Sequence, residues 1–423
     1  MHKIISLTGM EILDSRGRPT VKAICRLESG ITAAASVPSG ASTGASEALE
    51  LRDGDPSRYR GRGCLQAAEV INTTLHTALS GRVFDTQAEL DLMLIGLDGT
   101  QNKAHLGANT LLAVSIAFAR ACAYEQGLPL YSIFDSLLPG IEAQYMPRPM
   151  INLFSGGRHA GGQVAIQDVL VMPVSTIEMP DLLAMTAEVY ACAAELTQER
   201  YGMRLLRADE GGLAPPFTRV ENMFELAVAA IERAGLKPGA DVVLALDIAA
   251  TQFYADGRYN LDERRLSAHD FIALLAAWRR AYPIVSIEDG LAEDDWEHWP
   301  SLMQALGGDT VVIGDDLLCT NPSRIRQAAE TDSANGLLLK VNQIGTLTEA
   351  AESCMLANRA RWKVTVSARS GETEDDWLAD LAVGWAADFI KIGSITQSER
   401  LAKYNRMMEI EGETGTRMAA WAT

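Results

Sequence analysis

The second half of the chain repeats one pattern, in which a short apolar run meets a charged residue near its end. Six such residues follow one another at intervals of 41, 27, 25, 29 and 22 residues, and each interval has room for a strand, a helix and two loops. They are Asp247, Glu288, Asp315, Lys340, Arg369 and Lys391. Continuous apolar strands are buried on both faces, which is typical of a parallel sheet, and six in succession favour a closed barrel. We therefore predict an α/β barrel with these charged side chains gathered at one mouth.

The first half of the chain has a different pattern. Alternation of apolar and polar residues in segments such as 20–27 predicts two or three antiparallel strands, and the small polar residues of 36–48 predict a mobile loop. A helical pattern follows over 64–134. We therefore expect a smaller α+β domain over residues 1–140 and a barrel domain over residues 141–423.

Charge and cysteine content exclude several classes of protein. The 423 residues carry a formal charge of −18, which repels nucleic acid and anionic membranes, although metal ions and a few basic residues can reverse the field inside one cleft. The apolar segment 106–123 is interrupted by Asn109 and Arg120, so we expect a buried helix and no membrane span. The six cysteines are scattered without a CxxC pair, which argues against disulfides and zinc and favours a reducing cytoplasm.

Three of the strand-end residues are carboxylates. Asp247, Glu288 and Asp315 follow successive strands, so they can converge on one point and hold a hard divalent cation. Mg²⁺ is the natural candidate because it prefers oxygen ligands and keeps open positions for a substrate carboxylate, and Mn²⁺ also fits. The sequence therefore predicts a metal centre at the mouth of the barrel.

Lys340 and Lys391 come from the strands that follow, and two interpretations are open for each. A lysine beside a metal or a second ammonium has its charged form disfavoured and can act as a base, whereas the alternative is a salt bridge to one of the carboxylates. Earlier in the chain, Glu210 precedes two glycines that let the backbone approach a ligand, so it could be the acid facing that base. A base, an acid and a metal together indicate proton abstraction beside a carboxylate, followed by loss of a leaving group.

Ten ordered motifs carry a family resemblance. They are DSRGRPTV (14–21), SGASTG (39–44), LDGTQNKAHLGAN (97–109), DEGGLAP (209–215), ALDIAATQFY (245–254), SIEDGLAEDDW (286–296), GDDLLCTN (314–321), LLLKVNQIGTLTE (337–349), RSGETED (369–375) and SERLAKYN (398–405). By these motifs the chain resembles the enolase family over nearly its full length. The resemblance implies a small α+β N-terminal domain, an enolase-type αβ barrel and a homodimer or higher homo-oligomer. It also implies reversible dehydration of 2-phospho-D-glycerate to phosphoenolpyruvate in glycolysis with two Mg²⁺ ions.

The resemblance implies residue roles by position in the motifs. Lys340 resembles the family's base and Glu210 its acid, and the three carboxylates resemble the tight metal site. Ser42 resembles the serine that closes over the second metal. The residues that resemble substrate contacts are Arg369 and Ser370 for the phosphate, Lys391 for the carboxylate, and Gln167. His159 matches a histidine on a closing loop, and it is predicted to be catalytic together with Asp168, which lies beside the acid. For His159 alone, a capping or core role is the alternative.

The chain departs from the family pattern at five positions around this set. Ala368 replaces a histidine near the leaving hydroxyl, and Asp168 replaces a longer glutamate beside the acid. Ser155 replaces an asparagine, Arg158 stands where a small residue is usual, and Gln397 replaces an arginine. The base, the acid and the metal carboxylates are kept, so the changes alter the leaving-group and phosphate side of the pocket while keeping the chemistry.

Three interpretations of these departures are open. The first is a working enolase, or a glycolytic paralogue with lowered activity, because the base, acid and metal set is intact. The second is a paralogue that dehydrates a bulkier 2-phosphoglycerate analogue in phosphonate biosynthesis and resembles carboxyphosphonoenolpyruvate synthase. Ala368 and Asp168 would then supply room, and Arg158 could pair with an added carboxylate. The third is a non-catalytic structural or surface-binding relative.

Overall fold

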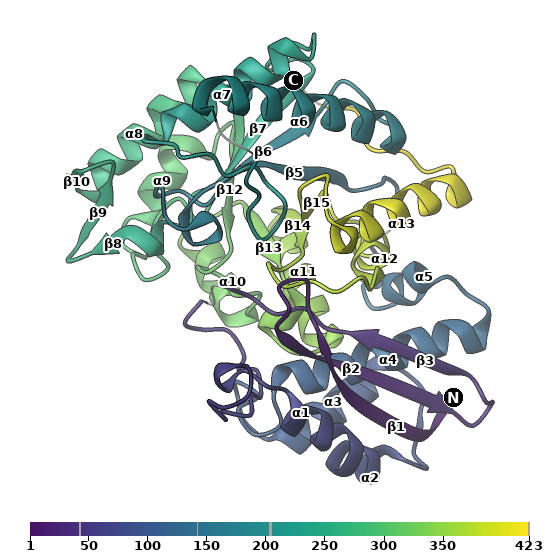
Figure 1. The fold of residues 1–423 in the computed structure, drawn as a ribbon. Coiled ribbons are helices and arrows are strands. Elements are labelled where there is room, and N and C mark those ends of the chain that lie inside the picture. The colour runs from purple at the N-terminus through teal and green to yellow at the C-terminus, as the bar shows by residue number, and fades with distance from the viewer. Residues whose placement is uncertain (42–43, 142, 203–204, 422–423) are drawn as a thin grey trace.

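The computed structural model describes residues 1–41, 44–141, 143–202 and 205–421, and Figure 1 shows a helix-covered sheet at the N-terminus beside a barrel. The N-terminal sheet has the strand order β3-β2-β1-β4. Its strands are β1 (His2–Leu13), β2 (Pro19–Leu27), β3 (Thr32–Ser36) and β4 (Val83–Phe84). The helices of this part are α1 (Leu65–Val70), α2 (His76–Leu79), α3 (Gln87–Asp98), α4 (Ala108–Gln126) and α5 (Leu130–Asp135). The predicted smaller α+β N-terminal domain is confirmed.

Alternating side chains hold the N-terminal sheet to its helices. β2 pairs antiparallel with β1 and β3, and its alternate residues Val21, Ala23 and Cys25 are fully buried. The segment predicted to form a buried helix is α4, which packs on β2 and β3. Among the residues that the structure describes, no helix is long and apolar enough to cross a membrane.

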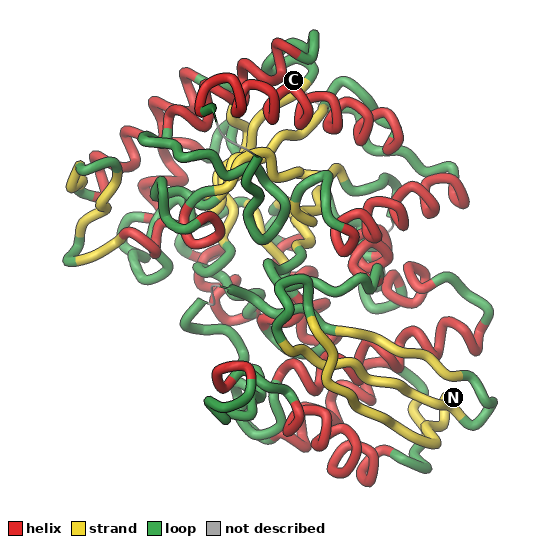
Figure 2. The backbone as a smooth tube through the Cα atoms, in the orientation of Figure 1, coloured by secondary structure: helices red, strands yellow, loops and turns green. Residues whose placement is uncertain are grey.

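The remaining strands close a barrel in the order β11-β12-β13-β14-β15-β5-β6-β7, which confirms the predicted fold class. They are β5 (Arg148–Ser155), β6 (Asp168–Pro173), β7 (Val242–Asp247), β11 (Ile284–Glu288), β12 (Val311–Gly314), β13 (Gly336–Leu339), β14 (Lys363–Ser367) and β15 (Phe389–Gly393). Figure 2 shows helices in red around these strands in yellow. The helices are α6 (Met179–Tyr201), α7 (Glu221–Arg233), α8 (Ala268–Ala281), α9 (Trp299–Leu306), α10 (Pro322–Glu330), α11 (Leu347–Arg359), α12 (Trp377–Gly384) and α13 (Ser398–Thr414). A separate small sheet contains β8 (Tyr254–Ala255), β9 (Arg258–Leu261) and β10 (Arg264–Leu266).

One strand departs from the all-parallel barrel that the sequence predicted. β6 pairs antiparallel with both β5 and β7. Residues 156–167, which join β5 to β6, contain one short 3-10 turn and no crossover helix, whereas a parallel pair needs a crossover connection. Because β6 runs the opposite way, its first residue, Asp168, lies opposite Ser155 and Asp247 at the ends of the neighbouring strands. The mouth of the barrel therefore receives one carboxylate from a strand start.

Candidate active site

The charged residues predicted at strand ends do gather at one mouth of the barrel. Asp247 and Glu288 are the last residues of β7 and β11, and they are paired in register. Asp315 and Lys340 come directly after β12 and β13. Lys391 lies within β15, and its Nζ reaches two of the carboxylates. The parallel register of these strands therefore brings the carboxylates and ammonium groups together.

Both lysines form ion pairs with the predicted metal ligands. Lys391 Nζ donates to Asp247 Oδ2 and to Glu288 Oε2, each at 2.7 Å, and Lys340 Nζ donates to Asp315 Oδ2 at 2.5 Å. Burial alone lowers the pKa of both lysines, but the adjacent carboxylates outweigh burial and raise each pKa above its usual value. The salt-bridge alternative thus describes this state, and the expectation that the charged form of Lys340 is disfavoured is not met in it.

The carboxylates present a set of hard oxygen donors that fits Mg²⁺. Glu288 Oε1 is buried and has no hydrogen-bond partner among the described residues, which makes it an oxygen that a hard cation can bind. Two groups among the described residues bring candidate ligand atoms within 4.8 Å of one another: His159, Asp168 and Glu210, and Asp289, Asp315 and Asp316. The predicted triad is not one of these groups, and Lys391 Nζ bridges Asp247 and Glu288 instead. Ser42, the predicted ligand of a second metal, lies outside the described residues.

The predicted acid lies in a buried group with one histidine. Glu210 Oε2 accepts a hydrogen bond from Asn152 Nδ2 at 3.1 Å, while His159 Nδ1 lies 4.0 Å from Glu210 Oε1 and 3.3 Å from Asp168 Oδ2. Burial lowers the pKa of His159, but the charges of Glu210 and Asp168 outweigh it and raise that pKa to about 9. Burial raises the pKa of Glu210, but His159 and nearby cations lower it overall. His159 therefore holds a proton close to an ionised Glu210.

Two of the departures from the family pattern contact each other. Ser155 Oγ donates to Asp168 Oδ1 at 2.5 Å, and both residues are fully buried. Burial is the main cause of a raised pKa at Asp168. The short carboxylate and the short hydroxyl thus form one hydrogen bond across β5 and β6, a pairing that the separate strand patterns did not predict.

The predicted phosphate-binding residues already have partners in the N-terminal part of the chain. Arg369 donates from Nη1 to Glu47 Oε2 at 3.0 Å, from Nη2 to Glu47 Oε1 at 3.2 Å, and also to Asn342 Oδ1 at 2.9 Å. Ser370 Oγ accepts from Arg16 Nη1 at 3.0 Å. Sequence reasoning missed Glu47 and Arg16 as site residues, although both lie in or beside quoted motifs, because nothing local shows that they reach the barrel.

A cavity of about 20 Å³ lies at the centre of these groups. Its lining residues are Ala41, His159, Gln167, Glu210, Asp247, Lys340, Ser367, Ala368, Arg369, Ser370 and Lys391. A space of this size holds about one water molecule, so a phosphorylated substrate requires rearrangement of the ion pairs around it. Gln167 Nε2 donates to Asp247 Oδ2 at 2.9 Å. Arg158 is exposed and does not line the cavity, so the structure does not bring this predicted substrate contact to the site.

Comparison with protein families covers both parts of the chain. Residues 4–134 match the model of the enolase N-terminal domain, and residues 143–422 match the model of the enolase C-terminal TIM barrel domain. The second match contains every strand of the barrel and the acid, base and carboxylate positions described above. The fold and these two matches together show that the chain belongs to the enolase family of lyases.

Proposed function

We propose that the protein catalyses Mg²⁺-dependent, reversible dehydration of 2-phospho-D-glycerate to phosphoenolpyruvate. The observation that supports this most directly is that Lys340, Glu210, Asp247 and Lys391 line one cavity with the phosphate-binding candidates Arg369 and Ser370. The proposed base Lys340, the proposed acid Glu210 and Lys391, the cation that would bind the substrate carboxylate, therefore lie around the same cavity. Loss of water from a 2-phosphoglycerate needs each of these groups.

The residues of the chain have separable roles in this proposal. Once its ion pair with Asp315 is broken, Lys340 releases its own proton to solvent, and the neutral amine removes the proton beside the substrate carboxylate. His159 holds a proton 4.0 Å from the carboxylate of Glu210, and in this proposal Glu210 takes up that proton and delivers it to the departing hydroxyl. Lys391 holds the substrate carboxylate with its buried ammonium. Asp247, Glu288 and Asp315 would hold Mg²⁺, which supplies positive charge for the dianion that forms when the proton leaves.

The direct test is phosphoenolpyruvate formation from 2-phosphoglycerate with excess Mg²⁺, followed by the absorbance of the product. We expect turnover of about 10 per second, a value ordinary for enzymes. Lys340→Ala should lower it by about 100-fold or more. Lys237→Ala removes an exposed lysine and should leave it unchanged. Equal turnover in both variants would contradict the assignment of Lys340 as the base.

A second candidate is dehydration of a bulkier 2-phosphoglycerate analogue, as in a carboxyphosphonoenolpyruvate synthase-like enzyme of phosphonate biosynthesis. Ala368 supports it, because its methyl group lines the cavity where the family has a histidine ring. Ala368→His separates the two functions. The variant should gain activity on 2-phosphoglycerate if the protein is an enolase, and it should lose native turnover if the substrate is bulkier. If neither activity changes in Ala368→His, the role assigned to this position is wrong. If the wild-type protein dehydrates neither substrate, a non-catalytic relative is favoured.

The homo-oligomeric state, the cytoplasmic location, the glycolytic role, and the domain limits 1–140 and 141–423 stay predictions from the sequence. The structural support for the small phosphorylated substrate is the buried Arg369 and Lys391 and the half-buried Lys340 in an otherwise acidic chain with a formal charge of −18. Size-exclusion chromatography with light scattering measures the oligomer directly.

A further inference from the structure

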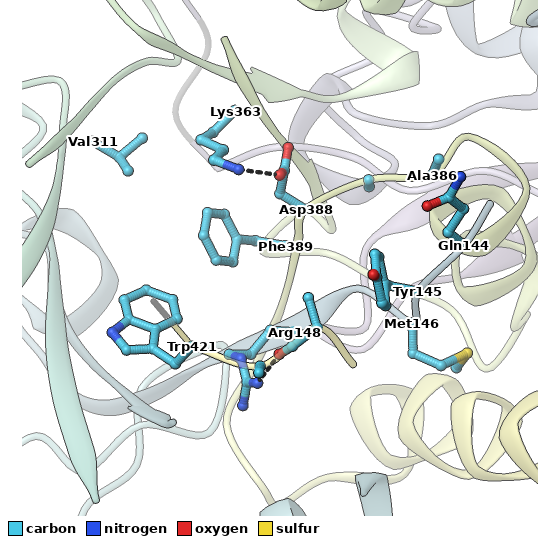
Figure 3. A pocket seen from close by; sticks show the side chains of 13 residues that line it. Gln144, Tyr145, Met146, Arg148, Val311, Lys363, Ala386, Asp388, Phe389 and Trp421 are labelled. Carbon is cyan, nitrogen blue, oxygen red and sulfur yellow. Dashed lines mark hydrogen bonds and ion pairs between the residues drawn. The ribbon is translucent and has the colours of Figure 1, made fainter. Parts of the chain in front are cut away.

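A second cavity, of about 390 Å³, lies at the end of the barrel opposite to the candidate active site. Figure 3 shows the side chains that line it. Four of its lining residues are the first residues of their strands: Arg148 in β5, Val311 in β12, Lys363 in β14 and Phe389 in β15. The groups of the candidate active site follow the ends of the parallel strands, so the two sites are separated by the length of the barrel. The volume lies within the range of about 300–1,000 Å³ that is usual for small-molecule sites.

The side chain of Arg148 is the unusual feature of this cavity. The residue is only 4% exposed, and its guanidinium donates to three backbone carbonyls: Pro173 O at 2.7 Å, Thr176 O at 2.9 Å and Ala419 O at 2.8 Å. No carboxylate of the described residues forms an ion pair with it. A guanidinium has five N–H donors, so the three bonds leave donors to spare, and the residues that the structure describes supply no counterion for the charge.

A buried cation without a counterion is costly. Burial lowers the pKa of Arg148 to about 10, so the group remains charged at neutral pH. The other cation of the cavity is already paired, because Lys363 Nζ donates to Asp388 Oδ1 at 2.6 Å. Arg148 is therefore the charge in this cavity that an anionic ligand would complement.

The walls beside Arg148 are apolar and aromatic. The rings of Phe389 and Trp421 are 6.4 Å apart at an interplanar angle of 49°, and Figure 3 shows Trp421 and Arg148 close to each other with Phe389 nearby. Tyr145 and Val311 line the same space. A strongly hydrated sugar phosphate would leave these surfaces without matching contacts, whereas an apolar body would cover them.

We propose that this cavity is a binding site for a small organic carboxylate with an aromatic or branched apolar body. The carboxylate accepts hydrogen bonds from the donors of Arg148 that the carbonyls leave, in the charge-assisted geometry that guanidinium groups favour. The body lies against Phe389 and Trp421. The proposed dehydration uses none of these residues, so this site and its test do not depend on that function.

Calorimetric titration with 3-phenylpropionate tests the proposal, with the neutral 3-phenyl-1-propanol as the matched probe. The wild-type protein should bind the acid saturably with a Kd of about 1 mM or tighter, and the alcohol about tenfold more weakly because it lacks the charge. Trp421→Ala removes one aromatic wall of the cavity and should weaken binding of the acid by about tenfold. Tyr124→Ala, which removes an exposed aromatic side chain elsewhere, should bind as the wild type does.

Each of three results would overturn the proposal: no saturable binding of the acid, equal binding of acid and alcohol, or unchanged binding in Trp421→Ala. Arg148→Gln tests directly whether the guanidinium binds the carboxylate. The test applies when thermal unfolding shows that the variant is folded. In that variant the acid and the alcohol should bind alike. If the Arg148→Gln variant does not fold, the proposal is still decided by how tightly the wild type and Trp421→Ala bind the acid and the alcohol.

Discussion

At the scale of single residues, the two predicted departures from the family pattern at Ser155 and Asp168 are in direct contact. Ser155 Oγ donates a 2.5 Å hydrogen bond to Asp168 Oδ1. Asp168 is fully buried, and its other oxygen has no hydrogen-bond partner in the part of the chain that the structure describes, so the contact with Ser155 is one of few that stabilise the carboxyl group. The pair thus keeps a carboxyl group 3.3 Å from His159.

Ser155→Ala should therefore destabilise the protein. The change leaves Asp168 Oδ1 buried without a donor, a loss of about 1–3 kcal/mol in the free energy of unfolding. Urea unfolding measures it. Ser175→Ala, on an exposed serine, provides the matched control and should stay within about 0.5 kcal/mol of the wild type. A loss in Ser155→Ala no larger than that of the control would show that the hydrogen bond is not a stabilising contact.

The raised pKa of His159 predicts a pH dependence of stability. The pKa is about 9 in the folded protein and close to 6.5 when the chain is unfolded, so the stabilisation is fully present below pH 6.5 and is lost as the pH rises through 9. It amounts to at most about 3 kcal/mol. Urea midpoints at pH 6.0 and 9.5 should differ less in His159→Gln than in the wild type. An identical difference in both proteins would contradict the assignment of the proton to His159.

At the scale of elements, the end of β15 depends on a glycine. Gly393 has φ of +125°, and an added Cβ would lie 2.9 Å from Arg400 Cδ and 3.0 Å from Glu210 O. The backbone of the next residue, Ser394, donates to that same Glu210 carbonyl at 2.9 Å. The conformation at this one position therefore holds the segment that carries the predicted acid against the barrel.

Gly393→Ala should lower both stability and dehydration activity, because strain at φ of +125° costs about 1–3 kcal/mol and the clash displaces Glu210. Thermal unfolding and turnover measure the two effects. Gly412→Ala is the matched control, since this glycine lies in α13 with nothing within 4 Å of an added Cβ. It should raise the free energy of unfolding by roughly 0.5–1 kcal/mol. A Gly393→Ala protein as stable and active as the control would contradict this account.

Much of this arrangement follows from local patterns, and some of it does not. Apolar runs predicted the strands, and their charged ends predicted which side chains meet, because parallel strands in a barrel end at one mouth. The antiparallel direction of β6 was not predicted, because a run of apolar residues is expected for a buried strand whether it runs parallel or antiparallel to its neighbours. The pairing of Arg369 with Glu47 joins residues that are 322 positions apart, and no periodicity reports on such a contact. The position of Arg158 outside the cavity depends on loop conformation, which residue type does not determine.

At the scale of the whole molecule, the N-terminal part completes the mouth of the barrel. Glu47 reaches Arg369, Arg16 reaches Ser370, and the backbone of Ser39 exchanges hydrogen bonds with Gly371. Glu47 neutralises Arg369 from one side, while Asp247, Glu288 and Asp315 neutralise the two lysines from the other. The charged side chains of the site thus compensate one another. When a dication and an anionic substrate bind, the carboxylates would pair with the dication and the lysines and Arg369 with the substrate.

Binding of Mg²⁺ should therefore stabilise the whole chain specifically. At 100-fold excess over its Kd, a ligand adds about 2.7 kcal/mol, which corresponds to a rise of a few degrees in Tm for a protein of this size. Thermal unfolding in MgCl₂ is compared with EDTA and NaCl at equal ionic strength, because a chain of formal charge −18 also gains from screening alone. Glu288→Gln should lose the gain specific to Mg²⁺, whereas Glu297→Gln, on an exposed carboxylate, should keep it. Equal gains in MgCl₂ and NaCl would mean that the carboxylates at the mouth hold no metal, and the proposed dehydration would lose its source of positive charge.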